Sequence, residues 1–74
     1  MSESKRYFFV IEGPSHTYDD DAGTWLWDDN AALTHATELI EELKNDGQYD
    51  FRDWLMIVRD ALGRTVFSIP FYAA

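Results

Sequence analysis

The sequence predicts an α+β fold with the order ββαββ: a four-stranded antiparallel sheet with one helix packed on one face. Three observations predict it. Two β-rich segments precede one amphipathic helix, two more follow it, and glycine-containing turns or connections lie within each pair of segments. The 74 residues are enough for a single small domain spanning residues 1–74.

The first strand is expected at residues 6–12, where aromatic and β-branched residues run up to Gly13-Pro14. A polar, acid-rich connection follows. The second strand is expected at residues 24–27, and it is short. We expect these two strands to pair with each other through the long loop between them.

The helix is predicted at residues 29–46. Its apolar residues recur at offsets of three and four and so form one stripe along the helix; they are Ala32, Ala36, Leu39, Ile40 and Leu43. Asp28 and Asp29 suit the N-cap, where free backbone amides and the positive end of the helix dipole favour carboxylates. Gly47 occupies the position of a left-handed C-cap.

The third and fourth strands are expected at residues 54–60 and 64–71. The turn between them contains Gly63, which suits a positive φ angle. Pro70 lacks a backbone donor, so the last strand is expected to lie at a sheet edge or to end there.

The order and spacing of several short motifs resemble a known family. These are Arg6-Tyr7-Phe8-Phe9, Gly23-Thr24-x-Leu26, Trp54-x-x-x-Val58, Asp60-x-x-Gly63-Arg64 and Ile69-Pro70-Phe71. The chain resembles small, mostly alphaproteobacterial proteins described as domain of unknown function 6894, from about residue 6 to residue 71. The resemblance implies a bacterial cytoplasmic protein of this layout, with no established activity, cofactor or catalytic residues. The chain differs from the family pattern at four positions that are usually polar or charged in the family and are apolar here, namely Val10, Trp25, Leu55 and Ile57.

Alternation along the strands divides their side chains between two faces of the sheet. The face expected to receive the helix carries Tyr7, Phe9, Ile11, Leu26, Trp54, Met56, Val58, Phe67, Ile69 and Phe71. The outer face carries a second apolar set, which is Phe8, Val10, Trp25, Trp27, Leu55, Ile57 and Val66. A sheet covered by one helix normally has polar residues there.

Such an apolar outer face exceeds what a soluble monomer usually exposes, so we interpret these seven residues as a partner-binding surface. The leading hypothesis is a homodimer formed by isologous contact of two outer faces, and a different protein partner is the next. The alternative is that the 13–23 loop and the chain termini cover this face within one molecule.

The chain has fourteen acidic and six basic residues and a net charge of −8. Because this charge repels phosphate backbones, no direct nucleic-acid binding is expected. A second functional hypothesis is an acidic regulatory protein, antitoxin-like or DNA-mimicking, that contacts a basic partner. Its working surface would be the carboxylates of Glu38, Glu41, Glu42 and residues 19–21. A small-molecule binding domain is the third hypothesis.

No catalytic residue, metal site or cofactor is predicted, and we expect the protein not to be an enzyme. Ser15, His16 and the Asp19–Asp21 run have the residue types of a hydrolytic triad, but neighbours in one loop rarely have its geometry. Consecutive aspartates point in different directions and suit a calcium site poorly. His35 is expected to touch core aromatic residues at the edge of the helix stripe. The short polar N-terminus predicts neither a signal peptide nor a membrane span, so the expected location is the cytoplasm.

Overall fold

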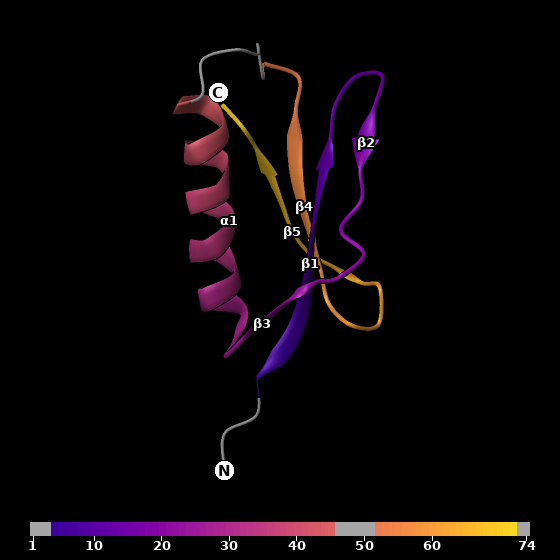
Figure 1. The fold of residues 1–74 in the computed structure, drawn as a ribbon, viewed down its shortest axis with the longest axis vertical. Helices are drawn as coiled ribbons and strands as arrows, with labels where there is room; N and C mark the ends of the chain where they lie inside the picture. Colours follow the sequence, from indigo (N-terminus) through magenta and orange to yellow (C-terminus); the bar gives the residue numbers. More distant parts are fainter. Residues whose placement is uncertain (1–3, 46–51, 73–74) are drawn as a thin grey trace.

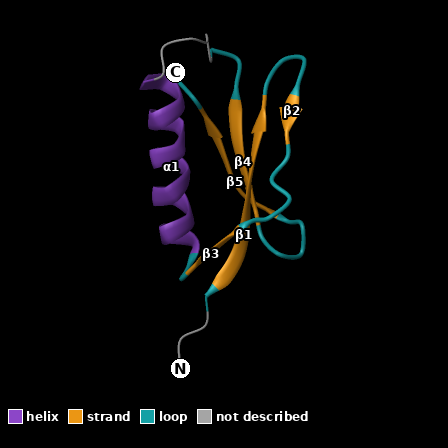
Figure 2. Ribbon diagram, viewed as in Figure 1, coloured by secondary structure: helices purple, strands orange, loops and turns teal. Residues whose placement is uncertain are grey.

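The computed structural model describes residues 4–45 and 52–72. One helix lies alongside a twisted antiparallel sheet, as Figures 1 and 2 show. The elements are β1 (Lys5–Glu12), β2 (Thr17–Tyr18), β3 (Thr24–Leu26), α1 (Asp29–Asn45), β4 (Leu55–Arg59) and β5 (Thr65–Pro70). This arrangement confirms the predicted α+β fold, and it adds the two-residue strand β2 within the predicted loop.

The sheet has the strand order β2-β1-β4-β5, and β3 pairs with the beginning of β1. All of these pairs are antiparallel. β1 and β4 are paired from Phe8 opposite Arg59 to Glu12 opposite Leu55, so they form the centre of the sheet. The strand order follows from the helix connection, which brings β4 next to β1 and leaves β5 at an edge.

The start of α1 is capped as predicted. The Asp28 side chain accepts a hydrogen bond from the backbone N–H of Ala31 through Oδ1 at 2.9 Å, and its carbonyl oxygen accepts one from Ala32 at 3.1 Å. These bonds satisfy amides that have no partner within the first turn of a helix. The helix is described up to Asn45, and the predicted end at residue 46 and the Gly47 cap lie outside the described residues.

The core lies between α1 and the inner face of the sheet. Its buried members are Tyr7, Phe9, Ala32, Ala36, Ile40, Met56, Val58 and Phe71. Ala32 and Ala36 are fully buried, and their small side chains let the helix backbone approach the large side chains of the sheet. Seven other members of the predicted sets are partly buried against this core: Ile11, Leu26, Leu39, Leu43, Trp54, Phe67 and Ile69. The predicted helix stripe and inner face are therefore confirmed.

Val66 corrects the prediction for the outer face. The β4–β5 pairing places Val58 opposite Phe67 but Arg59 opposite Thr65, which leaves Val66 as an extra residue in β5. Such a bulge interrupts the alternation of side chains between the two faces. Val66 consequently packs against the core instead of lying on the outer face.

The remaining strand ends differ from the prediction by one residue. β3 ends at Leu26, so Trp27 follows the strand instead of belonging to it. β4 and β5 each begin one residue later than predicted and end one residue earlier. β5 ends at Pro70 on the sheet edge, as expected for a residue without a backbone donor. Gly63 has φ of 82°, as the predicted turn requires.

Candidate functional site

The predicted partner-binding residues do not form one exposed surface. Val10 and Ile57 lie opposite each other at the centre of the sheet, and they are only 5% and 9% exposed. Phe8 and Leu55 are half-buried. Because Leu55 is paired with Glu12, it lies at the opposite end of β1 from the β3 strand that carries Trp25. The interpretation of Val10 and Ile57 as exposed contact residues is therefore wrong.

The segment between β2 and β3 accounts for part of this burial. Asp20 accepts hydrogen bonds from the backbone N–H of Phe9 at 3.1 Å and from that of Gly23 at 2.9 Å, through its two carboxylate oxygens. Residues 19–21 line a shallow hollow of about 270 Å³ together with Phe8 and Val10. The polar connection is thus held along the edge of β1, where residues 19–21 border the outer-face residues Phe8 and Val10.

Trp25 and Trp27 remain exposed, each to 63%. Trp25 is paired with Arg6 across β1 and β3. The Arg6 guanidinium carbon lies 5.1 Å from the centre of the Phe8 ring and 6.0 Å from that of Trp25, distances typical of cation–π contacts. Arg6 also donates a hydrogen bond through Nε to the carbonyl oxygen of Ala22 at 2.9 Å. Arg6 therefore orders the two aromatic rings at this end of the outer face.

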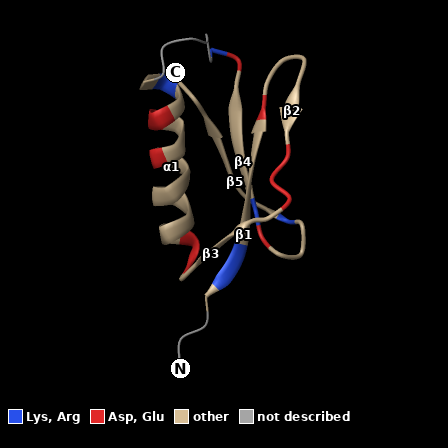
Figure 3. Ribbon diagram, in the orientation of Figure 1, with Lys and Arg blue, Asp and Glu red and all other residues tan. Residues whose placement is uncertain are grey.

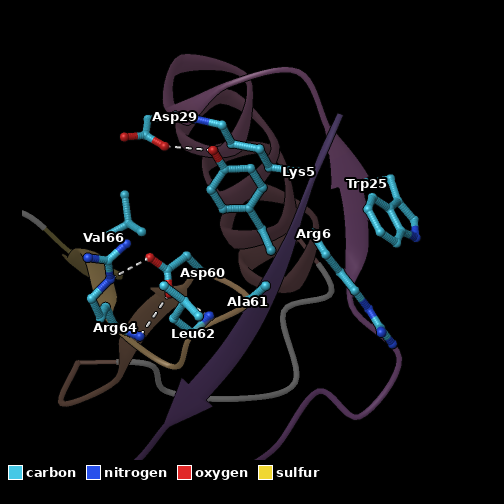
Figure 4. A pocket seen from close by; sticks show the side chains of 10 residues that line it. Lys5, Arg6, Trp25, Asp29, Asp60, Ala61, Leu62, Arg64 and Val66 are labelled. Atoms are coloured by element: carbon cyan, nitrogen blue, oxygen red, sulfur yellow. Dashed lines mark hydrogen bonds and ion pairs between the residues drawn. The ribbon is translucent and has the colours of Figure 1, made fainter. Parts of the chain in front are cut away.

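A larger hollow, of about 600 Å³, lies where β1 begins, next to the β4–β5 turn. Its lining is Lys5, Arg6, Tyr7, Trp25, Asp29, Asp60, Ala61, Leu62, Arg64 and Val66. Figure 4 shows that Leu62, Arg64 and Val66 lie on one side of the β1 ribbon and that Trp25 lies on the other. The hollow thus borders the exposed tryptophan end of the outer face.

The inner side of this hollow contains a buried tyrosine. The Tyr7 hydroxyl donates a hydrogen bond to Asp29 Oδ1 at 2.6 Å, and Tyr7 is only 1% exposed. Burial raises the pKa of Tyr7 to about 12, with smaller contributions from the Asp29 hydrogen bond and from the negative charges of Asp29, Asp28 and Asp60. Tyr7 is consequently a neutral donor that ties the inner face to the start of α1.

The β4–β5 turn is organised by the side chain of Asp60. It accepts hydrogen bonds at 2.9 Å from the backbone N–H groups of Leu62 and Arg64, and one at 3.0 Å from Arg64 Nε. The pKa of Asp60 is lowered, chiefly by the backbone hydrogen bond from Arg64. Leu62, at the tip of this turn, is 77% exposed. A fixed turn therefore presents an apolar side chain to solvent.

Both histidines that were considered for catalysis or metal binding contact aromatic rings. The His16 ring lies edge-on to Tyr18, with 4.5 Å between ring centres. His35 contacts the core residue Phe9 in the same manner at 4.8 Å, as predicted. Within residues 4–45 and 52–72 there is no group of three or more potential metal ligands among histidine and acidic side chains. The described helix is not long and apolar enough to cross a membrane.

The sequence interpretation missed the role of the residues around the larger hollow. The sequence predicts Leu62 only as part of a turn, although its side chain is apolar and gains nothing from the polar surroundings of a turn. Lys5 is predicted only as part of the polar N-terminal segment, and Arg6 only as the first residue of a strand. The pairing of Arg6 with Trp25 depends on the register between β1 and β3. Because β3 is so short, its residue pattern does not determine this register in advance.

Comparison with known proteins gives one family. A family model described as "Domain of unknown function (DUF6894)" matches residues 6–72, which include the exposed tryptophans and every lining residue of the two hollows except Lys5. No curated protein and no solved structure matches the chain.

Proposed function

This chain belongs to the DUF6894 family, and from that premise we propose that it is a non-enzymatic interaction module that associates with a second copy of itself. The proposed contact surface, the tryptophan surface, consists of Phe8 and Trp25 on the outer sheet face together with Trp27, which directly follows β3. The observation that carries the proposal is the 63% exposure of both tryptophans. Exposed tryptophans are unusual on a monomer surface and are among the commonest contributors to binding free energy at interfaces.

The geometry supports this smaller surface over the full outer face. Arg6 holds Phe8 and Trp25 close to the same guanidinium group, so both rings are ordered before any partner arrives. Pre-ordered aromatic groups lose little conformational entropy on binding. An isologous contact would bury two copies of each tryptophan, because the same surface serves both protomers.

The test is light scattering coupled to size exclusion over about a hundredfold dilution, for the wild type and for the double variant Trp25→Glu/Trp27→Glu. We expect a wild-type dimer and a folded monomeric variant. Leu33→Glu is the matched control, since Leu33 is an exposed apolar residue (38%) on α1, away from the sheet face. Ile57 is unsuitable for this test because a charge there would be buried. A monomeric wild type at every concentration would refute self-association.

The second candidate function is an acidic regulator that binds a basic partner. It is favoured by the exposure of Glu38, Glu41 and Glu42 on the outer side of α1. In Figure 3 acidic positions are coloured along α1 and again in the connection between β2 and β3. Capture of a basic protein that is lost when the salt concentration rises would favour this function, since exposed charge pairs are screened by salt.

A further inference from the structure

We propose that the 600 Å³ hollow at the beginning of β1 binds an acidic segment of a partner protein, one that carries a bulky apolar side chain next to its carboxylates. This proposal goes beyond self-association, because its main residues are Lys5, Leu62, Arg64 and Val66. None of these four belongs to the tryptophan surface, although Trp25 lines the hollow at its border with that surface.

The first argument is the apolar part of the hollow. Leu62 is 77% exposed on a turn that Asp60 fixes with three hydrogen bonds, and Val66 reaches the hollow through the β5 bulge. An apolar side chain of a partner that covers Leu62 and Val66 would remove that surface from water without reordering the turn.

The second argument is the charge around this apolar part. Three of the six lysines and arginines, namely Lys5, Arg6 and Arg64, line the hollow, against only two of the fourteen acidic residues. Figure 3 shows the basic residues of β1 at its beginning, remote from most of the acidic residues of α1. The lining is therefore less acidic than the chain as a whole. Arg6 is bonded to the carbonyl oxygen of Ala22 and extends toward Trp25 in Figure 4, so Lys5 and Arg64 are the basic side chains that meet a ligand in the hollow.

The two carboxylates in the hollow are already engaged within the molecule. Asp29 accepts the Tyr7 hydroxyl, and Asp60 accepts the hydrogen bonds of its own turn. Arg64 uses only Nε in its ion pair with Asp60, and its side chain is 73% exposed. Its guanidinium therefore still presents donors toward a carboxylate that approaches from solvent.

The ligand class follows from size and charge together. A hollow of about 600 Å³ can accommodate the side chains of a short peptide segment, and it is too large to be specific for a single ion. Nucleic acid would also bring anions, but a phosphate at every nucleotide is repelled by a chain of net charge −8. A segment with one or two carboxylates beside an apolar residue satisfies both Lys5 and Leu62 with far less repulsion.

The first experiment selects binders from a random peptide-display library on the immobilised full chain at low salt. We expect enriched sequences that combine Asp or Glu with Phe, Leu, Ile or Trp within a few residues. Enrichment of basic or purely apolar sequences would overturn the proposal, and so would the absence of any enrichment.

The second experiment measures the anisotropy of the most enriched peptide, labelled with a fluorophore, on purified variants. Leu62→Ala is expected to weaken binding about tenfold, as loss of a central interface side chain does. Its matched control is Leu33→Ala, at an exposed leucine on α1.

Lys5→Gln is expected to weaken binding of the same peptide about threefold. Its control Thr34→Glu changes the net charge by the same amount from an exposed position on α1.

Two outcomes would count against the hollow specifically. If Thr34→Glu weakens binding as much as Lys5→Gln does, the peptide responds to net charge and not to this site. If an oligo(dT) strand binds the wild type more tightly than the peptide and competes with it, the hollow is a nucleic-acid site. Self-association is measured separately by light scattering, so a monomeric wild type that still binds the peptide rejects the proposed function and retains this inference.

Discussion

At the scale of single residues, Tyr7 connects the sheet to the beginning of the helix. Its hydroxyl donates to Asp29 at 2.6 Å from a side chain that is 1% exposed. We expect Tyr7→Phe to lower the free energy of unfolding by about 1–3 kcal/mol, because hydrogen bonds to charged acceptors contribute this much and the ring itself is retained. Urea unfolding at neutral pH measures the difference. An unchanged midpoint would show that the bond has no net effect on stability.

The same tyrosine predicts a pH dependence. Its pKa is raised from the ordinary tyrosine value of 10.0 to about 12 in the folded protein, first by burial and then by Asp29. The folded state therefore favours the protonated form, and this contribution is fully present below pH 10 and is lost as the pH rises through 12. We expect the unfolding free energy to fall over this interval in the wild type. The fall should be smaller in Tyr7→Phe, which lacks the titrating group.

Gly13 provides a second test at the scale of single residues. Here glycine is required because a neighbouring ring leaves no room for a Cβ atom, and not because of the backbone angles. A Cβ atom added at Gly13 would lie 2.8 Å from Cζ2 of the Trp54 ring. That ring cannot easily move, because it stacks on Tyr18 at 5.9 Å and contacts Phe71 at 6.5 Å between ring centres. Gly13→Ala is therefore expected to cost about 1–3 kcal/mol of stability, as overpacking does. Thermal or urea unfolding gives the value.

The control for Gly13 is a double-mutant cycle with Trp54→Leu. Removing the large ring removes the clash, so Gly13→Ala should cost much less in that background. Equal costs in both backgrounds would contradict the steric explanation.

At the scale of elements, the segment between β2 and β3 is held to β1 by two side chains, Asp20 of the segment and Arg6 of β1, which donates to the carbonyl oxygen of Ala22. Asp20 accepts from the amides of Phe9 and Gly23, and the segment lies beside Val10. Asp20→Ala should cost about 1.5–3 kcal/mol, because two amides lose a charged acceptor. We expect hydrogen exchange to become faster at Phe9 and Gly23 and dye binding to reveal newly exposed apolar surface. Asp20→Asn, which keeps one acceptor oxygen, should show a smaller effect, and unchanged exchange at Phe9 would contradict this role.

The helix and the inner face were predictable because each depends on a regular period. Ala32, Ala36 and Ile40 follow the helical repeat, and Phe9 and Met56 follow the alternation of a strand, so burial could be predicted from position alone. Val66 was not predictable in this way. One extra residue between Thr65 and Phe67 changes the face of its side chain, and the residue types of β5 contain no sign of that bulge.

The candidate site was predictable only in part, for a related reason. Trp25 and Trp27 are exposed because of their position at the end of short β3, and the sequence indicated them correctly as unusual surface residues. Their relation to Arg6 and the position of Leu62 beside Lys5 depend on strand register and on a turn between distant segments. The burial of Val10 was not predictable, because the position of residues 19–21 beside it depends on hydrogen bonds to Asp20 that no local pattern encodes.

At the scale of the whole molecule, the charge distribution makes the two proposed associations respond to salt in opposite directions. Two copies with a net charge of −8 each repel one another, so screening should favour self-association through the tryptophan surface. An acidic peptide bound beside Lys5 and Arg64 is attracted locally, so screening should weaken it.

We therefore expect a rise from about 50 mM to about 500 mM NaCl to tighten the dimer about threefold and to weaken peptide binding about fivefold. Sedimentation velocity measures the first constant and fluorescence anisotropy the second, on the same preparation. The Leu33→Glu variant, with one added negative charge on α1, should show the stronger salt response in self-association if repulsion between whole chains is the cause. A dimer that weakens with salt would mean that charge pairs, and not the tryptophan rings, hold the two copies together.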